Sequence, residues 1–404
     1  MVLTRLDAQE AERIVENLRF GVPPPEYVRT FTVGREEELK ELQASLESPS
    51  EDTGAALLVR ANYGAGKSHL LQIVREMALE ANYATSLVVV NAQEGVRFNR
   101  MDTVFGAVCR EIEVKGFSSP GVGALFDAYE AVADKKLSPE LDEFRARLSS
   151  NGRWDHSELL EAPGIYIALR AWLHSQDGRT RNLIVDWLQN PQNYRGQRKL
   201  LYQELVEKLR SSFRDPRAEW QYYAEEVFIF HTGGHRQSWD ALSDLHQVAR
   251  LAGCRGLILL FDEFEDVVQN LNRRDLQEQA FLNLFRFFTG DRYPGMSYFA
   301  VTPDFVEKCK VELLTRGVYD FDFSRFDDLP FFELSEISQE DFVDLARRIR
   351  SVHALAYGWE AESLCDDVQL RGLAQKLWTI ASPDRVRRAI QGVVEALDES
   401  LEGG

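Results

Sequence analysis

One stretch of the chain has the residue types and spacing that bind phosphate. It reads Ala61-Asn62-Tyr63-Gly64-Ala65-Gly66-Lys67-Ser68, followed by His69, and it matches the phosphate-binding loop pattern apart from alanine at the first glycine position. In this pattern glycines let backbone N–H groups surround phosphate oxygens, the lysine reaches the β- and γ-phosphates, and the serine hydroxyl ligates Mg²⁺. The stretch predicts a site for ATP and Mg²⁺, with a chance glycine-rich turn as the alternative.

Two adjacent carboxylates, Asp262 and Glu263, follow the apolar run 257–261. In nucleotide hydrolases one carboxylate at the end of a buried strand holds Mg²⁺ through water, and its neighbour polarises the attacking water. We assign the first role to Asp262 and the second to Glu263. The pair favours an ATPase over a kinase, because a kinase must keep water away from the γ-phosphate. A buried strand that ends in an acidic turn is the alternative.

Three further side chains are candidates for contact with the γ-phosphate. Thr302 follows the apolar run 297–301 and is the candidate sensor, unless it only begins a turn before a proline. Arg325 precedes the last apolar run and is the candidate for a finger that reaches a neighbouring subunit's nucleotide; Arg316 is its rival, and a surface ion pair is the alternative role. Arg385, at the start of a C-terminal helix, is the candidate lid arginine, with Arg388 as its rival and a solvated first turn as the alternative.

Five apolar runs predict the strands that position these residues. They are too uniformly apolar for half-exposed strands and suit a parallel sheet buried on both faces. Their ranges are 55–59, 87–90, 256–261, 297–301 and 331–334. A helix is predicted from Ser68 to about Ala81, so strand, turn and helix surround the glycine-rich stretch as a phosphate-binding loop requires. The predicted fold is an α/β P-loop NTPase with a parallel five-stranded sheet.

The chain divides into three predicted parts. An N-terminal helical entry segment covers residues 1–50, an ATPase core covers 51–335, and a C-terminal helical lid covers 336–404. Within the core, about 97–235 is a helical insertion, far longer than one crossover helix needs. It holds four of the seven tryptophans, namely Trp154, Trp172, Trp187 and Trp220. These predict a small core of its own and a role in recognising a partner, with packing alone as the alternative.

Composition limits the class of protein. The 404-residue chain carries 47 Lys and Arg against 65 Asp and Glu, a formal net charge of −18, which argues against a protein that coats nucleic acid. Six arginines nevertheless gather in the lid: Arg347, Arg348, Arg350, Arg385, Arg387 and Arg388. No stretch reads as a membrane span or a secretion signal, and the four cysteines lie too far apart for a metal site. We expect a cytoplasmic protein without membrane contact.

The order of these parts resembles that of the AAA+ ATPases, nearest the initiator and helicase-loader type. The resemblance adds Val33-Gly34-Arg35-Glu36 ahead of the loop, which implies that Gly34 and Arg35 contact the nucleotide. The stretches ANYGAGKSHLL, GLILLFDEFED and YFAVTPDFVEK further resemble the ATP-binding proteins of BREX phage-defence systems, in particular the BrxD-like group of type 2 systems. That family implies ATP binding, ATP hydrolysis and work beside DNA-handling partners.

Two classes of function follow. In the first, the protein is an ATPase motor or loader that assembles with copies of itself and acts on a helicase, another defence-system protein or DNA. In the second, it is a nucleotide-gated signalling switch whose insertion binds a protein partner and whose slow hydrolysis only resets it. Stimulation of the ATPase rate by DNA would distinguish the two.

Overall fold

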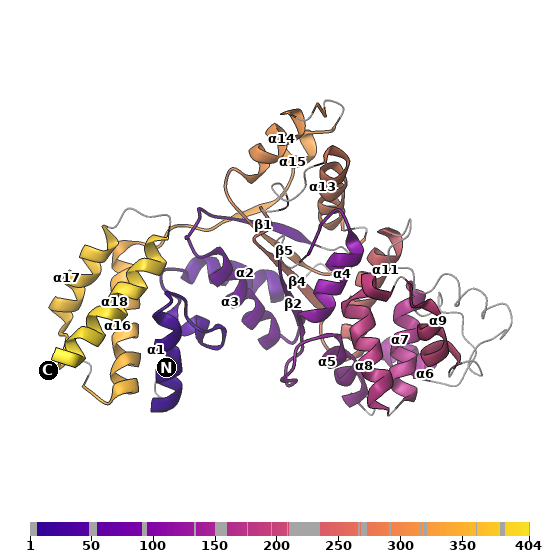
Figure 1. The fold of residues 1–404 in the computed structure, drawn as a ribbon, viewed down its shortest axis with the longest axis horizontal. Coiled ribbons are helices and arrows are strands. Elements are labelled where there is room, and N and C mark those ends of the chain that lie inside the picture. The colour runs from indigo at the N-terminus through magenta and orange to yellow at the C-terminus, as the bar shows by residue number, and fades with distance from the viewer. Residues whose placement is uncertain are drawn as a thin grey trace. The chain divides into compact units, whose positions relative to one another are not determined.

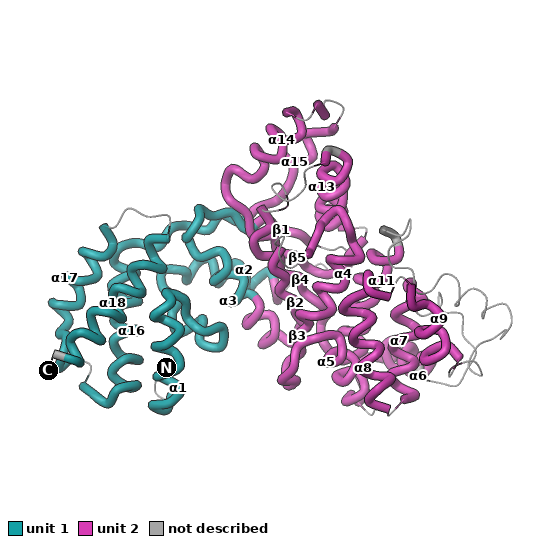
Figure 2. Tube along the Cα trace, viewed as in Figure 1, with its two compact units in different colours: residues 1–45, 59–74, 332–404 teal, residues 46–58, 75–331 magenta. Residues whose placement is uncertain are grey.

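A computed structural model gives the fold of the chain (Figure 1). It describes residues 6–47, 55–90, 95–132, 135–149, 160–175, 177–194, 196–207, 209, 235–265, 267, 273–290, 292–315, 317–318, 321–360, 362–379 and 384–403. The described residues form a mixed α/β structure. Their contacts define two compact units (Figure 2): unit 1 comprises residues 1–45, 59–74 and 332–404, and unit 2 comprises 46–58 and 75–331.

The described strands form a six-stranded sheet. They are β1 (Ala56–Arg60), β2 (Ala84–Val89), β3 (Ile112–Glu113), β4 (Leu257–Asp262), β5 (Ser297–Val301) and β6 (Phe331–Glu333), in the order β3-β2-β4-β5-β1-β6. β2, β4 and β5 pair in parallel, with Val89 opposite Asp262 and Phe261 opposite Phe299. All six residues of β4 and all five of β5 are buried, as expected for central strands of a parallel sheet covered on both faces.

The prediction of a five-stranded, wholly parallel sheet is wrong. Each of the five apolar runs does contain a strand, but β3 adds a sixth, and it pairs antiparallel with β2. The helix before it, α4, stops at Arg110, and Ile112 already belongs to β3. A two-residue edge strand is too short to show the alternation that identifies strands in a sequence.

The insertion is helical, as predicted. Its described helices are α4 (Met101–Arg110), α5 (Val122–Ala131), α6 (Pro139–Ser149), α7 (Pro163–His174), α8 (Gly178–Gln189), η4 (Pro191–Tyr194), α9 (Arg198–Leu201) and η5 (Tyr202–Val206). They lie on the β2 side of the sheet in Figure 1, and α11 (His235–Leu251) leads back to β4.

The prediction that the insertion has its own core is wrong for the described residues. Trp172 and Trp187 belong to the same buried cluster as Leu58 of β1 and Phe261 of β4. Trp154 and Trp220 lie outside the described residues. The apolar faces of the insertion helices therefore extend the core of the sheet, because α4 and α11 pack directly on β2 and β4.

A cluster of aromatic rings fills the centre of unit 2. The ring of Phe98 lies 4.8 Å from that of Phe264 and 5.5 Å from that of Phe261, both edge to face. Phe261 in turn stacks on Phe299 at 4.8 Å. Such pairs add to the apolar area they bury, so β4 and β5 are firmly held where their carboxyl ends emerge. The remaining described helices of this unit are α13 (Arg274–Thr289), α14 (Phe305–Thr315) and α15 (Ser324–Asp327).

Unit 1 has a second core, made by the two ends of the chain. It contains α1 (Ala8–Leu18), η2 (Pro25–Phe31), α2 (Glu36–Glu47), α16 (Gln339–Tyr357), α17 (Asp367–Trp378) and α18 (Arg385–Gly403), and α3 (Lys67–Glu80) begins in it. The apolar face of α1 packs against α16 and α18. Arg19, just after α1, donates to both carboxylate oxygens of Asp398 on α18 at 2.9 and 3.1 Å. Among the described helices, none is both long and apolar enough to cross a membrane.

Candidate functional site

The glycine-rich loop lies between β1, which ends at Arg60, and α3, which begins at Lys67. Gly64 and Gly66 have φ angles of 75° and 96°, a left-handed conformation that glycine adopts readily. The Ala65 N–H donates to the Asn62 carbonyl at 3.1 Å and closes the turn. The N–H groups of the first turn of α3 are not used by the helix ladder, so the loop and the helix start offer donors suited to an anion.

Lys67 is buried, at 8% exposure, and its Nζ donates to the Ala61 carbonyl at 3.2 Å. This contact holds the ammonium beside the loop from which it comes. Ser68, one residue later, is exposed. A buried cation and an accessible hydroxyl therefore lie at adjacent positions of the helix start, both within unit 1.

Arg35 fastens the loop to the segment after β6. Its Nη2 donates to the Ala65 carbonyl at 3.1 Å, its Nη1 donates to the Ser335 carbonyl, and it pairs with Glu38 at 3.2 Å. Gly34, with φ 62°, leaves room for Asp341, because a Cβ there would lie 2.5 Å from that carboxylate. Arg35 therefore positions the loop, and contact of Gly34 and Arg35 with a nucleotide stays a prediction.

His69, the second residue after Lys67, is also held by a hydrogen bond. Its Nε2 lies 2.9 Å from the Thr32 hydroxyl. Burial, and then the positive charge of Arg35, lower the pKa of His69 to about 4. The ring is therefore neutral at pH 7, and its hydrogen bond ties α3 to the segment that carries Arg35.

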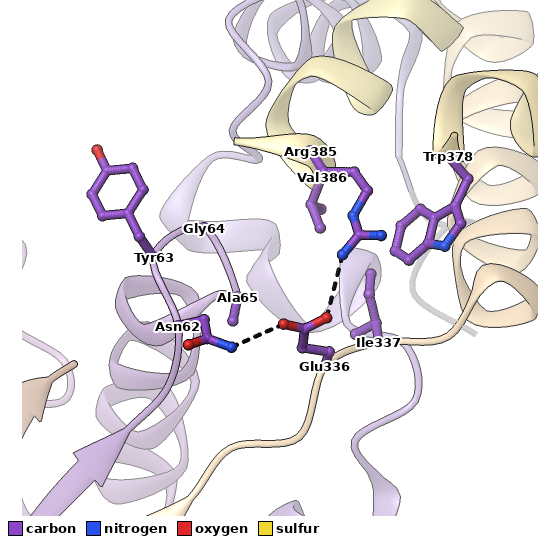
Figure 3. Close-up of a pocket in the computed structure, with 9 residues that line it drawn as sticks. All are labelled: Asn62, Tyr63, Gly64, Ala65, Glu336, Ile337, Trp378, Arg385 and Val386. Atoms are coloured by element: carbon purple, nitrogen blue, oxygen red, sulfur yellow. Dashed lines mark hydrogen bonds and ion pairs between the residues drawn. The ribbon is translucent and has the colours of Figure 1, made fainter. Parts of the chain in front are cut away.

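A pocket of about 330 Å³ opens beside the loop (Figure 3). Asn62 and Arg385 lie on opposite sides of Glu336, whose carboxylate accepts from Asn62 Nδ2 at 3.0 Å and from Arg385 Nη2 at 3.3 Å. The Arg385 guanidinium also lies over the Trp378 ring, 4.8 Å from its centroid. The exposed Tyr63 points away from Arg385. The structure thus brings the predicted lid arginine to the loop's own pocket, within one unit.

Glu336 and Trp378 are site residues that the sequence analysis missed. Neither belongs to a motif, and their place follows from tertiary contacts. The only sequence signal is position: Glu336 comes three residues after β6, and Trp378 ends the helix before Arg385's helix.

The predicted catalytic carboxylates lie in unit 2, at the carboxyl end of β4. Asp262 is 8% exposed, and its Oδ1 accepts the Glu263 N–H at 2.9 Å. Glu263 is exposed and has a φ of 53°, an uncommon value for a residue with a side chain. Strained backbone of this kind clusters at functional sites.

Thr302 follows β5, the neighbour of β4 in the sheet. Its Oγ1 is buried and has no hydrogen-bond partner among the described residues. The nearby Thr302 hydroxyl, and then Lys308, lower the pKa of Asp304. The Thr302 carbonyl accepts the Phe305 N–H at 3.0 Å. Thr302 therefore starts the turn into α14 while lying at the same edge of the sheet as Glu263.

Arg325 lies on α15, with its guanidinium 4.5 Å from the centroid of the Phe285 ring. Asp327, one expected partner, pairs instead with Lys310 at 2.5 Å. The rival Arg316 lies outside the described residues. Arg325 is thus held by an aromatic contact within unit 2.

Four of the six lid arginines have partners in unit 1. Arg347 pairs with Asp367 at 2.7 Å, and Arg350 pairs with the same carboxylate at 3.2 Å. Arg348 donates to two backbone carbonyls near the chain's N-terminal end, and Arg385 pairs with Glu336. These contacts stabilise unit 1. The other two arginines, Arg387 and Arg388, are exposed. Three of the six arginines therefore pair with carboxylates, which reduces the positive charge of the lid.

Comparison with known protein families gives one match. The family model described as BREX system ATP-binding protein BrxC/D matches residues 6–150 and 229–399, most of the chain. The match includes the glycine-rich loop, the strand-end carboxylates and Arg385. Searches of curated proteins and of solved structures each returned no match. The chain belongs to the BrxC/D family of BREX system ATP-binding proteins.

Proposed function

We propose that this protein binds ATP at the glycine-rich loop as a P-loop NTPase. The observation that carries the proposal is the loop itself, in which two left-handed glycines lead to a helix start that bears Lys67 and Ser68. The backbone donors suit the phosphates, and the Lys67 ammonium supplies a point charge for the β- and γ-phosphates. Ala61, at the first glycine position of the pattern, is buried, and its carbonyl accepts from Lys67.

Mg²⁺ fits the same assignment. Among the residues that the structure describes, no three His, Cys, Asp or Glu side chains form a metal cage. Mg²⁺ commonly takes one or two protein oxygens together with phosphate oxygens and water. In this proposal Ser68 would supply a hydroxyl oxygen and Asp262 a carboxylate oxygen, and the ion when bound would neutralise charge that develops on the phosphates.

We infer that the protein hydrolyses ATP. Glu263 would orient and polarise the attacking water, Thr302 would sense the γ-phosphate, and Arg385 would contact it from the lid. Arg325 would act on a neighbouring copy. The support is the position of Glu263 and Thr302 at the ends of adjacent parallel strands, where ligands of open α/β sheets bind.

The biological proposal is a cytoplasmic motor or loader of BREX phage defence, of the BrxD-like type 2 group, that forms homo-oligomers and acts with a helicase or DNA. Its functional parts are the entry segment 1–50, the core 51–335 and the lid 336–404. A nucleotide-gated switch is the alternative. The ion pairs of the lid arginines weaken the argument for DNA contact there.

The insertion at 97–235 remains our proposed recognition element. Because its buried side chains share the core of the sheet, deletion of a segment such as 118–160 would remove α5 and α6 and expose that core. Surface substitutions on the described insertion helices are therefore the better test: they should abolish partner capture while leaving ATP binding intact.

Calorimetry with Mg²⁺ and ATP tests the proposal, followed by phosphate release with and without DNA. We expect binding, slow turnover by the protein alone, and faster turnover with DNA if the motor assignment is right. Absence of ATP binding by the folded protein would refute the function, whereas DNA-independent turnover would favour the switch.

A further inference from the structure

We propose that Glu336 regulates the nucleotide site by competing with the terminal phosphate of ATP for Arg385. The inference rests on the proposed function and adds a residue that belongs to none of the motifs described above. Its basis is one carboxylate that joins a side chain of the loop to a side chain of the lid helix (Figure 3).

Glu336 is delivered to the loop by backbone contacts. The Leu334 N–H donates to the Arg60 carbonyl at 2.9 Å, which joins the end of β6 to the end of β1. Arg35 then donates to the Ser335 carbonyl and to the Ala65 carbonyl of the loop. Because the residue before Glu336 is tied to the loop in this way, the carboxylate is positioned beside Asn62 whether or not it holds Arg385.

Arg385 has two partners that define where it rests. Its guanidinium lies over the Trp378 ring and pairs with Glu336 at 3.3 Å. Trp378 is itself stacked on Phe342, 5.3 Å between centroids. A carboxylate and a phosphate are both anionic acceptors for a guanidinium. Arg385 must therefore break its ion pair with Glu336 before all of its N–H donors can bind a phosphate.

The strength of the pair suits a regulatory role. The side chains of Arg385 and Glu336 are 37% and 55% exposed, and such solvent-exposed ion pairs are weak. A phosphate can therefore displace Glu336 without a large penalty. A triphosphate carries more negative charge than a diphosphate and therefore competes better with Glu336 for Arg385. Glu336 thus helps the site to distinguish ATP from ADP.

Calorimetry with ADP and with the non-hydrolysable β,γ-imido-ATP, both with Mg²⁺, tests this on the full chain. Glu336→Gln keeps the shape and removes the charge, and we expect about two- to fivefold tighter binding of β,γ-imido-ATP, the range of an exposed ion pair. Binding of ADP should change less. Glu333→Gln, three residues before Glu336, is the matched control. The Glu333 carboxylate is also 55% exposed and pairs with Arg60, and its loss should leave both affinities unchanged.

A double substitution tests the route through Arg385. If Glu336 acts by holding that arginine, Glu336→Gln should give no gain when Arg385→Gln is already present. A gain that persists there would overturn the competition, as would equal affinities for wild type, Glu336→Gln and Glu333→Gln. If neither wild type nor Glu336→Gln binds either nucleotide, the proposed function itself fails. Nucleotide binding by Glu336→Gln but not by wild type would support both the proposed function and the competition for Arg385.

Discussion

The glycine-rich loop of unit 1 and the strand-end carboxylates of unit 2 are held by different kinds of contact. Around the loop, Lys67, Arg35 and Asn62 each have a polar partner within hydrogen-bonding distance. Asp262, by contrast, ends a strand that aromatic packing holds, beside Phe261 in the ring cluster. A ligand can exchange with polar partners, whereas a packed strand fixes the backbone that carries its carboxylates. We therefore expect changes at the loop to alter affinity and changes at the strand ends to alter rate.

The largest effect is expected at Arg325, which would serve a neighbouring copy. Arg325→Ala should lower ATP turnover by about 10³-fold or more, with ATP affinity nearly unchanged, because an arginine finger acts on transition-state charge. Mixing Arg325→Ala with Lys67→Ala should restore turnover that neither variant shows alone. The control is Arg273→Ala, an exposed arginine of the same unit paired with Asp275. A concentration-independent rate without complementation would mean that Arg325 only packs on Phe285.

Glu263→Gln should come next, with single-turnover hydrolysis slowed by about 10²- to 10⁴-fold, the usual contribution of a general base. The amide keeps the shape of the side chain but loses the basic oxygen. Affinity for ATP, measured by calorimetry, should stay within error of wild type. Asp262→Asn should instead weaken retention of Mg²⁺. Wild-type turnover by Glu263→Gln would show that the strand end does not carry the chemistry.

The free energy of unfolding should depend on pH through His246, whereas ATP binding should not depend on this residue. Burial, followed by the charge of Arg250, lowers the pKa of His246 to about 4 from 6.5, although its bond to Leu257 opposes this. The unfolded chain takes up this proton below about pH 6.5 and the folded chain does not, so stability is lost as pH falls toward 4. The difference corresponds to about 3 kcal/mol.

Urea denaturation of wild type and His246→Asn between pH 7 and 4 measures that loss. The substitution should flatten the pH dependence of the unfolding free energy by about 3 kcal/mol over this range. Because His246 contacts Leu257, at the opposite end of β4 from Asp262, ATP affinity at pH 7 should not change. An unaltered pH dependence in the variant would show that His246 does not titrate as its burial implies.

The smallest of these effects is expected at Lys67. Lys67→Ala should weaken ATP binding by about 10- to 100-fold, the loss of one charged hydrogen-bonding contact. Lys40→Ala, which removes an exposed lysine paired with Glu37 in the same unit, is the matched control. Equal affinities for Lys67→Ala and wild type by calorimetry would contradict the assignment of the loop.

Local pattern was enough to predict much of this protein. The spacing of Gly64, Gly66 and Lys67 predicted a turn between a strand and a helix, and the structure has β1 end at Arg60 and α3 begin at Lys67. The uniformly apolar runs around Phe261 and Phe299 predicted buried strands, and both strands are wholly buried. Such features depend on residues close in sequence, where periodicity and turn chemistry are informative.

Only the tertiary structure decided the partners of these residues. The sequence suggested a basic lid, but Arg347 and Arg350 share the carboxylate of Asp367. It separated the N-terminal helix from the C-terminal helices, which share one core. Glu336 reaches Asn62, 274 residues away, because β6 pairs with β1. Which distant surfaces meet depends on the packing of whole elements, and no short window of sequence records that choice.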